Sequence, residues 1–234
     1  MSLRSKKRKV YSLQGTYETR MWNDEVDIHY FHKKRGGEYF LKKCLDEARS
    51  KDIIFNSSLV NSKQEKPWLR AGWRVSSTLY LYTYLFTKPL TKNSKSRNFE
   101  VEKLDQDSFE EIVSLDKEIF NPYWRSSSLS LLDTLRSCND TTIYTHKKEG
   151  RLLAYAIVGV TMRSSFLQRF AVHPEVQGIG LGTSMLDNVL IDMKEKKMIS
   201  MKLNTQPNNR TAQRLYENKG FFLSNQELLV MASK

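Results

Sequence analysis

The sequence predicts an α/β fold of the α+β type. Its 234 residues are enough for one to two domains and a substantial core. In the second half of the chain, segments with apolar residues at strand spacing alternate with segments that have them at helical spacing. A glycine-rich turn at residues 177–182 joins one such strand to one such helix. This alternation is typical of strands and helices that pack together in one domain.

The glycine-rich turn is expected to bind an anion. Phe170, Ala171 and Val172 suit a buried strand, which Pro174 ends because proline cannot extend a ladder. A helix is expected over 182–197. Glycines let backbone N–H groups approach a ligand, and such groups at a helix N-terminus attract negative charge. The residues expected to cradle a phosphate or pyrophosphate are Gln177, Gly178, Ile179, Gly180, Leu181, Gly182 and Thr183.

The spacing of the turn limits which phosphate carrier it fits. It lacks the Lys-Ser/Thr ending of a P-loop, and its glycines do not match the dinucleotide fingerprint. The pattern that fits is Gln-x-x-Gly-x-Gly, formed by Gln177, Gly180 and Gly182. It resembles the acetyl-CoA loop of the GNAT N-acetyltransferases. For the turn taken alone, a plain strand-to-helix connection is the alternative.

A second motif, at residues 208–222, strengthens the resemblance. It is similar to the family's Asn…Ala-x-x-Leu-Tyr-x-x-x-Gly-Phe element. In that family the tyrosine is usually the general acid and the asparagine seven residues earlier contacts the cofactor; here these positions are Tyr216 and Asn209. For Tyr216, a tyrosine that only packs in the helix is the alternative. Together the two motifs imply that the cofactor is acetyl-CoA, as co-substrate, and that no metal is needed.

The resemblance also implies how the thioester is handled. The strand at 170–172 is expected to splay from its neighbour, so that its free N–H and C=O groups bind the pantetheine arm like a partner strand. A backbone N–H near Val172 is the expected oxyanion donor, and Tyr216 is the expected acid for the departing thiolate. Tyr123 and Trp124 lie where family members line the acceptor pocket. Packing of these two side chains in the core is the alternative.

The general base is missing from its usual place. Alanine N-acetyltransferases carry a glutamate twelve positions before the tyrosine, and this chain has Asn204 there. An asparagine cannot take a proton at neutral pH. Gln206 could position a water, and Glu118 or His173 could act as the base through waters. An α-amino group has a pKa of about 7.7–8.0 and a lysine about 10.4, so the missing base favours a protein N-terminus or a small-molecule amine.

The expected elements of the second domain, residues 99–234, match the usual order of the family on a mixed, bent central sheet. They are a strand at 99–104, a helix from Asp107, a helix from Ser127 or Ser128, strands at 141–146 and 152–163, the strand at 170–172, the helix at 182–197, a strand at 198–204, the helix of Tyr216 and two final strands. Motifs that include Asp116, Trp124, Arg169 and Asn204 resemble an actinobacterial GNAT subgroup. By motif, the chain is also similar to the ribosomal-protein alanine N-acetyltransferases.

The first part of the chain repeats this order in a shorter form. Residues 10–90 are expected to form two short strands before residue 32, a helix at 38–51, a strand at 52–60, a short helix at 64–71 and a strand region at 74–86. Aligning Gly72 with Gly220 places Trp68 where Tyr216 stands. Tryptophan cannot supply a phenolic proton. We therefore expect a smaller, degenerate GNAT-like half domain, joined to the second domain by a linker at 91–98.

Charge and cysteine content bear on partners and compartment. The net charge is +12, and residues 1–97 carry the excess, with 21 Lys and Arg against 9 Asp and Glu. The basic arm at 1–9 is expected to be disordered; it could bind RNA, ribosomes or another acidic partner, or only aid solubility. Cys44 and Cys138 have no metal or redox spacing, and no apolar run is long enough to span a membrane. A cytoplasmic protein is expected.

The sequence thus predicts an N-acetyltransferase that moves an acetyl group from acetyl-CoA to a primary amine by direct attack, with Tyr216 as general acid. The alternative is a non-catalytic acetyl-CoA-binding module whose basic N-terminal region binds RNA or the ribosome. The intact glycine loop and Tyr216 favour the enzyme, and Asn204 keeps the alternative open.

Overall fold

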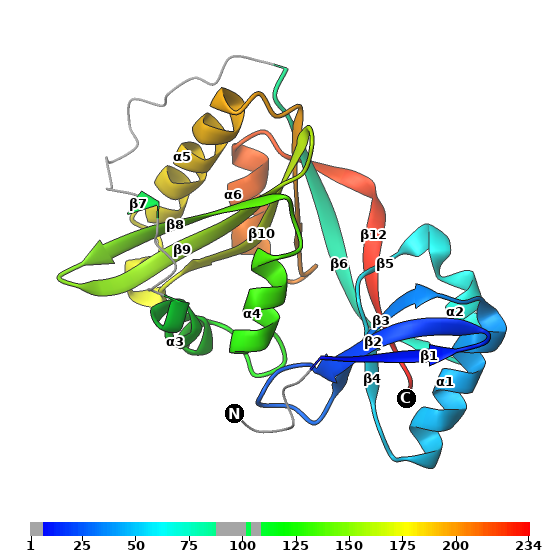
Figure 1. Cartoon of the computed structure of the whole chain (residues 1–234). Helices are drawn as coiled ribbons and strands as arrows, with labels where there is room; N and C mark the ends of the chain where they lie inside the picture. The colour runs from blue at the N-terminus through cyan, green and yellow to red at the C-terminus, as the bar shows by residue number, and fades with distance from the viewer. Residues whose placement is uncertain (1–6, 88–101, 104–108) are drawn as a thin grey trace. The chain divides into compact units, whose positions relative to one another are not determined.

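The computed structural model describes residues 7–87, 102–103 and 109–234 (Figure 1). The described chain forms two compact units, one of residues 1–80 with 225–234 and one of residues 81–224. The predicted linker at 91–98 and most of the predicted arm at 1–9 lie outside the described residues. Arg8 and Lys9, which the prediction assigned to the arm, belong to the first strand.

The first unit is a small sheet with its helices inserted between strands. Its strands are β1 (Arg8–Ser12), β2 (Gly15–Met21), β3 (His29–Arg35), β4 (Phe55–Ser57), β5 (Val60–Asn61) and parts of β6 (Arg74–Leu85) and β12 (Phe222–Ala232). Its helices are α1 (Glu38–Ser50) and the short α2 (Lys66–Arg70). β1, β2 and β3 pair antiparallel, and β3 pairs parallel with β4. The region before residue 32 therefore holds three strands, not the two expected, because residues 13 and 14 turn the chain back on itself.

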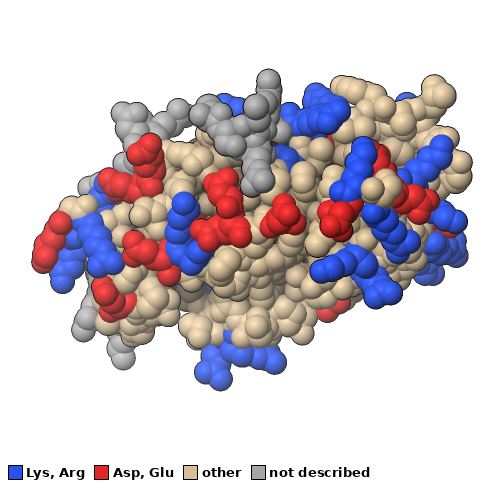
Figure 2. Space-filling view, turned by 90° about the horizontal axis from the view of Figure 1, so that it is seen from below, with Lys and Arg blue, Asp and Glu red and all other residues tan. Residues whose placement is uncertain are grey.

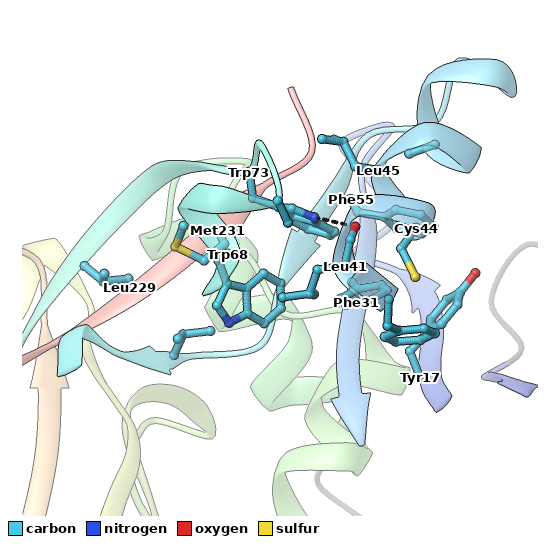
Figure 3. Close-up of a cluster of buried hydrophobic side chains, with 14 residues drawn as sticks. Tyr17, Phe31, Leu41, Cys44, Leu45, Phe55, Trp68, Trp73, Leu229 and Met231 are labelled. Atoms are coloured by element: carbon cyan, nitrogen blue, oxygen red, sulfur yellow. Dashed lines mark hydrogen bonds between the residues drawn. The ribbon is translucent and has the colours of Figure 1, made fainter. Parts of the chain in front are cut away.

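Aromatic side chains dominate the core of the first unit (Figure 3). Phe31 lies within 5.3 Å of Phe55 and 5.0 Å of Trp73, measured between ring centroids. The indole N–H of Trp73 donates to the carbonyl oxygen of Leu41 on α1 at 3.0 Å. Burial of an aromatic ring whose polar atom has a partner stabilises a core without an unsatisfied donor. Trp68, the residue aligned with Tyr216, is buried in this cluster.

The second unit is built on a mixed sheet. Its own elements are β7 (Glu102–Lys103), α3 (Phe109–Ile119), α4 (Ser128–Leu135), β8 (Asp140–Lys148), β9 (Arg151–Val160), β10 (Ser164–Val172), α5 (Leu181–Glu195), β11 (Ser200–Thr205) and α6 (Arg210–Asn218). The strand order runs β6-β11-β10-β9-β8-β7. All neighbours from β7 to β10 are antiparallel, whereas β10 and β11 are parallel. The predicted α/β fold with a mixed sheet is confirmed.

Helices cover both faces of this sheet (Figure 1). Ala171 packs in one cluster with apolar residues of α3 and α4. A Cβ placed on Gly182 of α5 would meet the side chains of Phe170 and Val172. Because neighbouring side chains of a strand point to opposite faces, α3 and α4 cover one face of β10 and α5 the other. Ser127 caps α4 by accepting from the N–H of Ser130, as expected.

The expected pair of strands at the end of the chain is also wrong. The chain after α6 forms one strand, β12, and not two. Its eleven residues contain neither glycine nor proline, so nothing in them ends the strand. One neighbour of β12 in the sheet is β6, which comes from an earlier part of the chain.

Candidate active site

The outer half of β10 has a partner strand on one side only among the described residues. The parallel ladder with β11 pairs Ser164 with Ser200 and ends at Leu167 and Leu203. The antiparallel ladder with β9 continues to Val172. A bulge interrupts that ladder between Leu167 and Arg169, at the point where β10 and β11 separate. Residues 168–172 thus offer an open strand edge.

The backbone groups of Val172 face this open edge. The N–H of His173 donates to the carbonyl oxygen of Leu153 on β9 at 2.8 Å. Since successive residues of a strand point their backbone groups to opposite sides, those of Val172 point away from β9, as do those of Phe170. The side-chain amide of Gln177 donates to the carbonyl oxygen of Val172 at 2.8 Å, which fits this direction. A bound chain with amide groups could pair here.

The glycine loop follows directly from this edge. A 3₁₀ turn, Pro174–Val176, begins it, and Gly178 and Gly180 have φ of 77° and 94°. A Cβ on either glycine would have no heavy atom within 4 Å among the described residues, so both face open space. Gly180 is the N-cap of α5, no side chain of a described residue caps this helix, and no acidic residue lies in its first turn. These features suit an anion.

The other predicted loop residues differ in how far their side chains are buried. Leu181 is buried at the start of α5, while Ile179 is exposed and Thr183 partly buried. The Cβ of an alanine at Gly182 would make ordinary contacts with Val172, Phe170 and Leu215 at 3.5–3.7 Å. Gly182 is therefore not a site of backbone strain, unlike the two glycines before it.

The residues of the second motif lie on α6. Asn209 is the N-cap of α6, and its side-chain oxygen accepts from the N–H of Ala212 at 3.2 Å. Lys219 at the other end of α6 donates to Asp187 of α5 at 2.7 Å. Leu215, next to Tyr216, is the α6 residue that approaches Gly182. The start of α5 and the middle of α6 are thereby brought together.

The phenol of Tyr216 is almost fully buried. Its ring packs against those of Tyr82 and Phe221, with centroids 6.2 and 5.8 Å away. Burial raises the pKa of the Tyr216 hydroxyl above its ordinary value of 10.0, because an apolar environment disfavours the phenolate. No described residue makes a hydrogen bond with this hydroxyl. The group is thus a protonated donor at neutral pH.

Tyr123 and Trp124 lie in the loop between α3 and α4. Their rings meet edge to face with centroids 4.8 Å apart, and both side chains are partly buried. The carbonyl oxygen of Trp124 accepts from the guanidinium of Arg169 on β10 at 2.7 Å. The predicted acceptor residues are therefore tied to the strand that presents the open edge.

No general base stands out among the residues that the structure describes. Asn204, at the expected base position, is exposed. Gln213 on α6 donates to the carbonyl oxygens of Gln206 and Pro207, both at 2.9 Å, and so holds the loop between β11 and α6. His173 lies 3.3 Å from a carboxylate oxygen of Glu118. Within the described ranges, no group of three or more His, Cys, Asp or Glu residues could hold a metal ion.

Asp116 and Tyr155, both fully buried, form a polar cluster with the partly buried Arg169, and the sequence analysis gave this cluster no role. One signal could have found it. Asp116 stands on the apolar face of its helix, one turn after Ile112 and next to Leu115, both of which are buried. A carboxylate at such a position requires a buried partner.

Three further features lie outside the site. Lys7, Lys9 and Lys34 surround the buried carboxylate of Glu18, with N–O distances of 3.2, 3.9 and 3.5 Å. On the face drawn in Figure 2, Lys and Arg side chains lie among Asp and Glu side chains. Across the residues that the structure describes, no helix has the length and apolar character needed to cross a membrane.

Comparison with known proteins assigns part of the chain to a family. The model of the Acetyltransferase (GNAT) family matches residues 109–221. Over 74 residues the chain is 30% identical to the [Ribosomal protein bS18]-alanine N-acetyltransferase of Escherichia coli K12. The aligned residues make up 32% of this chain and 50% of that protein. The chain therefore spans about half the length of the curated relatives it matches.

Solved structures share the fold. A GCN5-related N-acetyltransferase from Sphaerobacter thermophilus has a TM-score of 0.66 at 10% identity and covers 93% of this chain and 76% of its own. A tandem GNAT protein from the clavulanic acid biosynthesis pathway has a TM-score of 0.64 at 12% identity. The match covers 94% of this chain and 78% of that protein's chain. Residues 109–221, which carry the open strand edge, the glycine loop and Tyr216, belong to the acetyltransferase (GNAT) family.

Proposed function

We propose that the chain is an N-acetyltransferase that transfers the acetyl group of acetyl-CoA to a primary amine by direct attack. The observation that carries this proposal is the open edge of β10, which leads directly into a loop with two left-handed glycines. An extended ligand with amide groups can pair with such an edge, and a diphosphate suits the first N–H groups of a helix. Coenzyme A contains both parts in that order.

The residues present fit this ligand. The backbone groups of Phe170 and Val172 offer the edge for the pantetheine arm, whereas those of Ala171 between them point to β9. Residues 177–183 offer N–H groups for the diphosphate. The nitrogen of the Asn209 side chain is a further donor, because its oxygen is used in capping α6. When bound, acetyl-CoA supplies an acetyl group already activated as a thioester.

The chain's own chemistry then concerns one oxygen and the proton given to the sulfur, while the proton that the attacking nitrogen loses passes to solvent water. Backbone N–H groups on the open edge donate to the oxygen that becomes negative during attack, as donors fixed in advance do in other acyl transfers. The hydroxyl of Tyr216 holds a proton for the sulfur that leaves, and the raised pKa keeps that proton in place over the physiological range.

The acceptor class follows from the missing base. With Asn204 exposed at the base position, the amine must arrive largely deprotonated. An α-amine with a pKa of about 7.7–8.0 meets this condition better than a lysine at about 10.4. The relative in Escherichia coli is named for the alanine of a ribosomal protein, which supports a protein N-terminus; a small-molecule amine is the other acceptor we propose.

Two measurements on the full chain test the proposal. Calorimetry with acetyl-CoA and with coenzyme A should show binding of both. Mass spectrometry should then show acetylation of a peptide with a free N-terminal alanine at pH 7.5, and much slower acetylation of a peptide with a blocked N-terminus and one lysine. If calorimetry detects binding of neither acetyl-CoA nor coenzyme A, the proposed function is wrong.

A non-catalytic acetyl-CoA-binding module remains the second candidate, because Asn204 replaces the base. Binding of acetyl-CoA without acetylation of any of several peptide and small-molecule amines would favour it. A salt-dependent shift of RNA that is lost on deletion of residues 1–9 would show that such a module also binds nucleic acid.

We place the protein in the cytoplasm as part of the proposal, since Cys44 and Cys138 are both free thiols.

A further inference from the structure

Asp116 on α3 is a carboxylate with no exposed surface and a full set of partners. Arg169 donates to it twice, from Nε at 2.7 Å and from Nη2 at 2.9 Å. The hydroxyl of Tyr155 on β9 donates at 2.5 Å, and the backbone N–H of Ser126 at 2.7 Å. Four donors on two oxygens leave the carboxylate a single orientation.

Arg169 extends this cluster to the loop between α3 and α4. Its Nη2 also donates to the carbonyl oxygen of Trp124 at 2.7 Å. Its guanidinium carbon lies 3.8 Å from the centroid of the Phe120 ring. With the bond from Ser126 to Asp116, the loop is held at three points within seven residues. Of the proposed acceptor residues, Trp124 is one of these points and Tyr123 precedes it directly.

The bulge in β10 explains how Arg169 reaches Asp116. In a regular strand, neighbouring side chains point to opposite faces. Here Gln168 donates to the carbonyl oxygen of Thr134 on α4 at 3.2 Å, and Arg169 bonds Asp116 on α3. Both side chains therefore point to the face covered by α3 and α4. An extra residue in a strand re-aims a side chain in this way.

The cluster is better suited to setting a position than to adding stability. A buried ion pair often contributes no more than apolar side chains of the same size would, because both charges lose their hydration. Its bonds are directional, however, and a guanidinium that binds a carboxylate with two nitrogens fixes an angle as well as a distance. Phe170, whose backbone faces the open edge, is the next residue after Arg169.

We propose that Asp116 and Arg169 are positioning residues that hold the acceptor loop, residues 120–127, in register with the open edge of β10. The loop's role in binding the amine rests on the proposed function. Residues 168–172 of β10 then serve both substrates. Their open backbone edge faces the coenzyme, and the side chain of Arg169 holds the loop that binds the amine.

The test compares variants that break the pair in different ways. Arg169→Lys keeps the charge but loses the two-nitrogen geometry. The double variant Asp116→Leu/Arg169→Met replaces the pair with apolar side chains of similar size, so that no unpaired charge is buried. Glu111→Gln is the matched control, since it removes an ion pair of the same helix, with Lys147 on β8 at 2.6 Å, away from the loop.

Each variant is measured for acetyl-CoA affinity by calorimetry and for KM and kcat with a peptide that has a free N-terminal alanine. Acrylamide quenching of Trp124 reports on the loop, after subtraction of the same variant with Trp124→Phe. We expect the two pair variants to bind acetyl-CoA within twofold of the unchanged protein, to raise the peptide KM at least tenfold and to double the quenching of Trp124. The control should change none of these.

Two results would overturn the proposal. One is a folded double variant with unchanged peptide KM and unchanged quenching. The other is a loss of acetyl-CoA affinity as large as the loss for the peptide, which would make the pair a general structural element. If the unchanged protein binds no acetyl-CoA, the proposed function fails instead, and the quenching of Trp124 alone then decides whether the pair holds the loop.

Discussion

The backbone N–H of Trp73 donates to the carbonyl oxygen of Trp68 at 3.0 Å, just after α2. In the second unit, the N–H of Phe221 donates to the carbonyl oxygen of Tyr216, also at 3.0 Å, just after α6. The residue before each donor is a glycine, with φ of 91° in the first unit and 89° in the second. These matching turns support the proposal that the first unit is a degenerate repeat, in which Trp68 takes the place of the phenol.

Trp68→Phe should leave catalysis intact and weaken the first unit. Trp68 is buried and packs edge to face on Trp73, with ring centroids 5.0 Å apart. A smaller ring leaves a gap, which costs about 1–3 kcal/mol of the free energy of unfolding. Urea unfolding should show this loss, while kcat and the affinity for acetyl-CoA stay unchanged. A fall in kcat in a folded variant would mean that the first unit takes part in the chemistry.

Tyr216→Phe should lower kcat by about 10²–10⁴-fold, the usual contribution of a positioned general acid. The affinity for acetyl-CoA should change little, because no described residue depends on the phenolic oxygen for a hydrogen bond. Rapid-mixing kinetics with the alanine peptide would measure the first quantity and calorimetry the second. A variant with the kcat of the unchanged protein would leave Tyr216 as a packing residue of α6.

The pH dependence of the rate should come from the acceptor and not from Tyr216. The acid acts in its protonated form, and burial raises its pKa above 10.0, so its proton is retained from pH 6 to pH 9. The rate should therefore rise with pH up to the pKa of the amine, about 7.7–8.0 for an α-amine, and then stay level. A pH profile of kcat/KM would show a falling limb below pH 9 if the phenol titrated in this range.

Gly180→Ala and Gly182→Ala form a matched pair of loop variants. Gly180 has φ of 94°, where an alanine costs about 1–2 kcal/mol, although its Cβ would meet nothing. Gly182 lies inside α5 without a left-handed φ, and alanine there favours the helix by up to about 1 kcal/mol. Gly180→Ala should thus weaken both stability and acetyl-CoA binding, whereas Gly182→Ala should be at least as stable as the unchanged protein. Equal thermal stabilities would contradict this account.

Local patterns made most of the fold predictable. Gly180, Tyr216 and Ser127 each carry a signal in their own neighbourhood: a glycine-rich turn, a helix motif and a capping residue. The single strand β12 was missed because its partner β6 lies more than a hundred residues away in sequence, and pairing over such distances leaves no local pattern. The role of Arg169 was missed for the same reason, since it depends on a bulge and on a carboxylate from another helix.

The two free thiols should differ sharply in reactivity. Cys44 is buried in the first unit, and burial, with Glu47 nearby, raises the pKa of its thiol to about 12. Cys138 is only partly buried. Because the thiolate is the reactive form, an aromatic disulfide reagent at pH 8 should modify one thiol of the folded protein, at Cys138, and the second only after unfolding. In Cys138→Ser the folded protein should not react at all. Modification of two thiols at equal rates in the folded protein would show that the core around Cys44 opens far more readily than its packing implies.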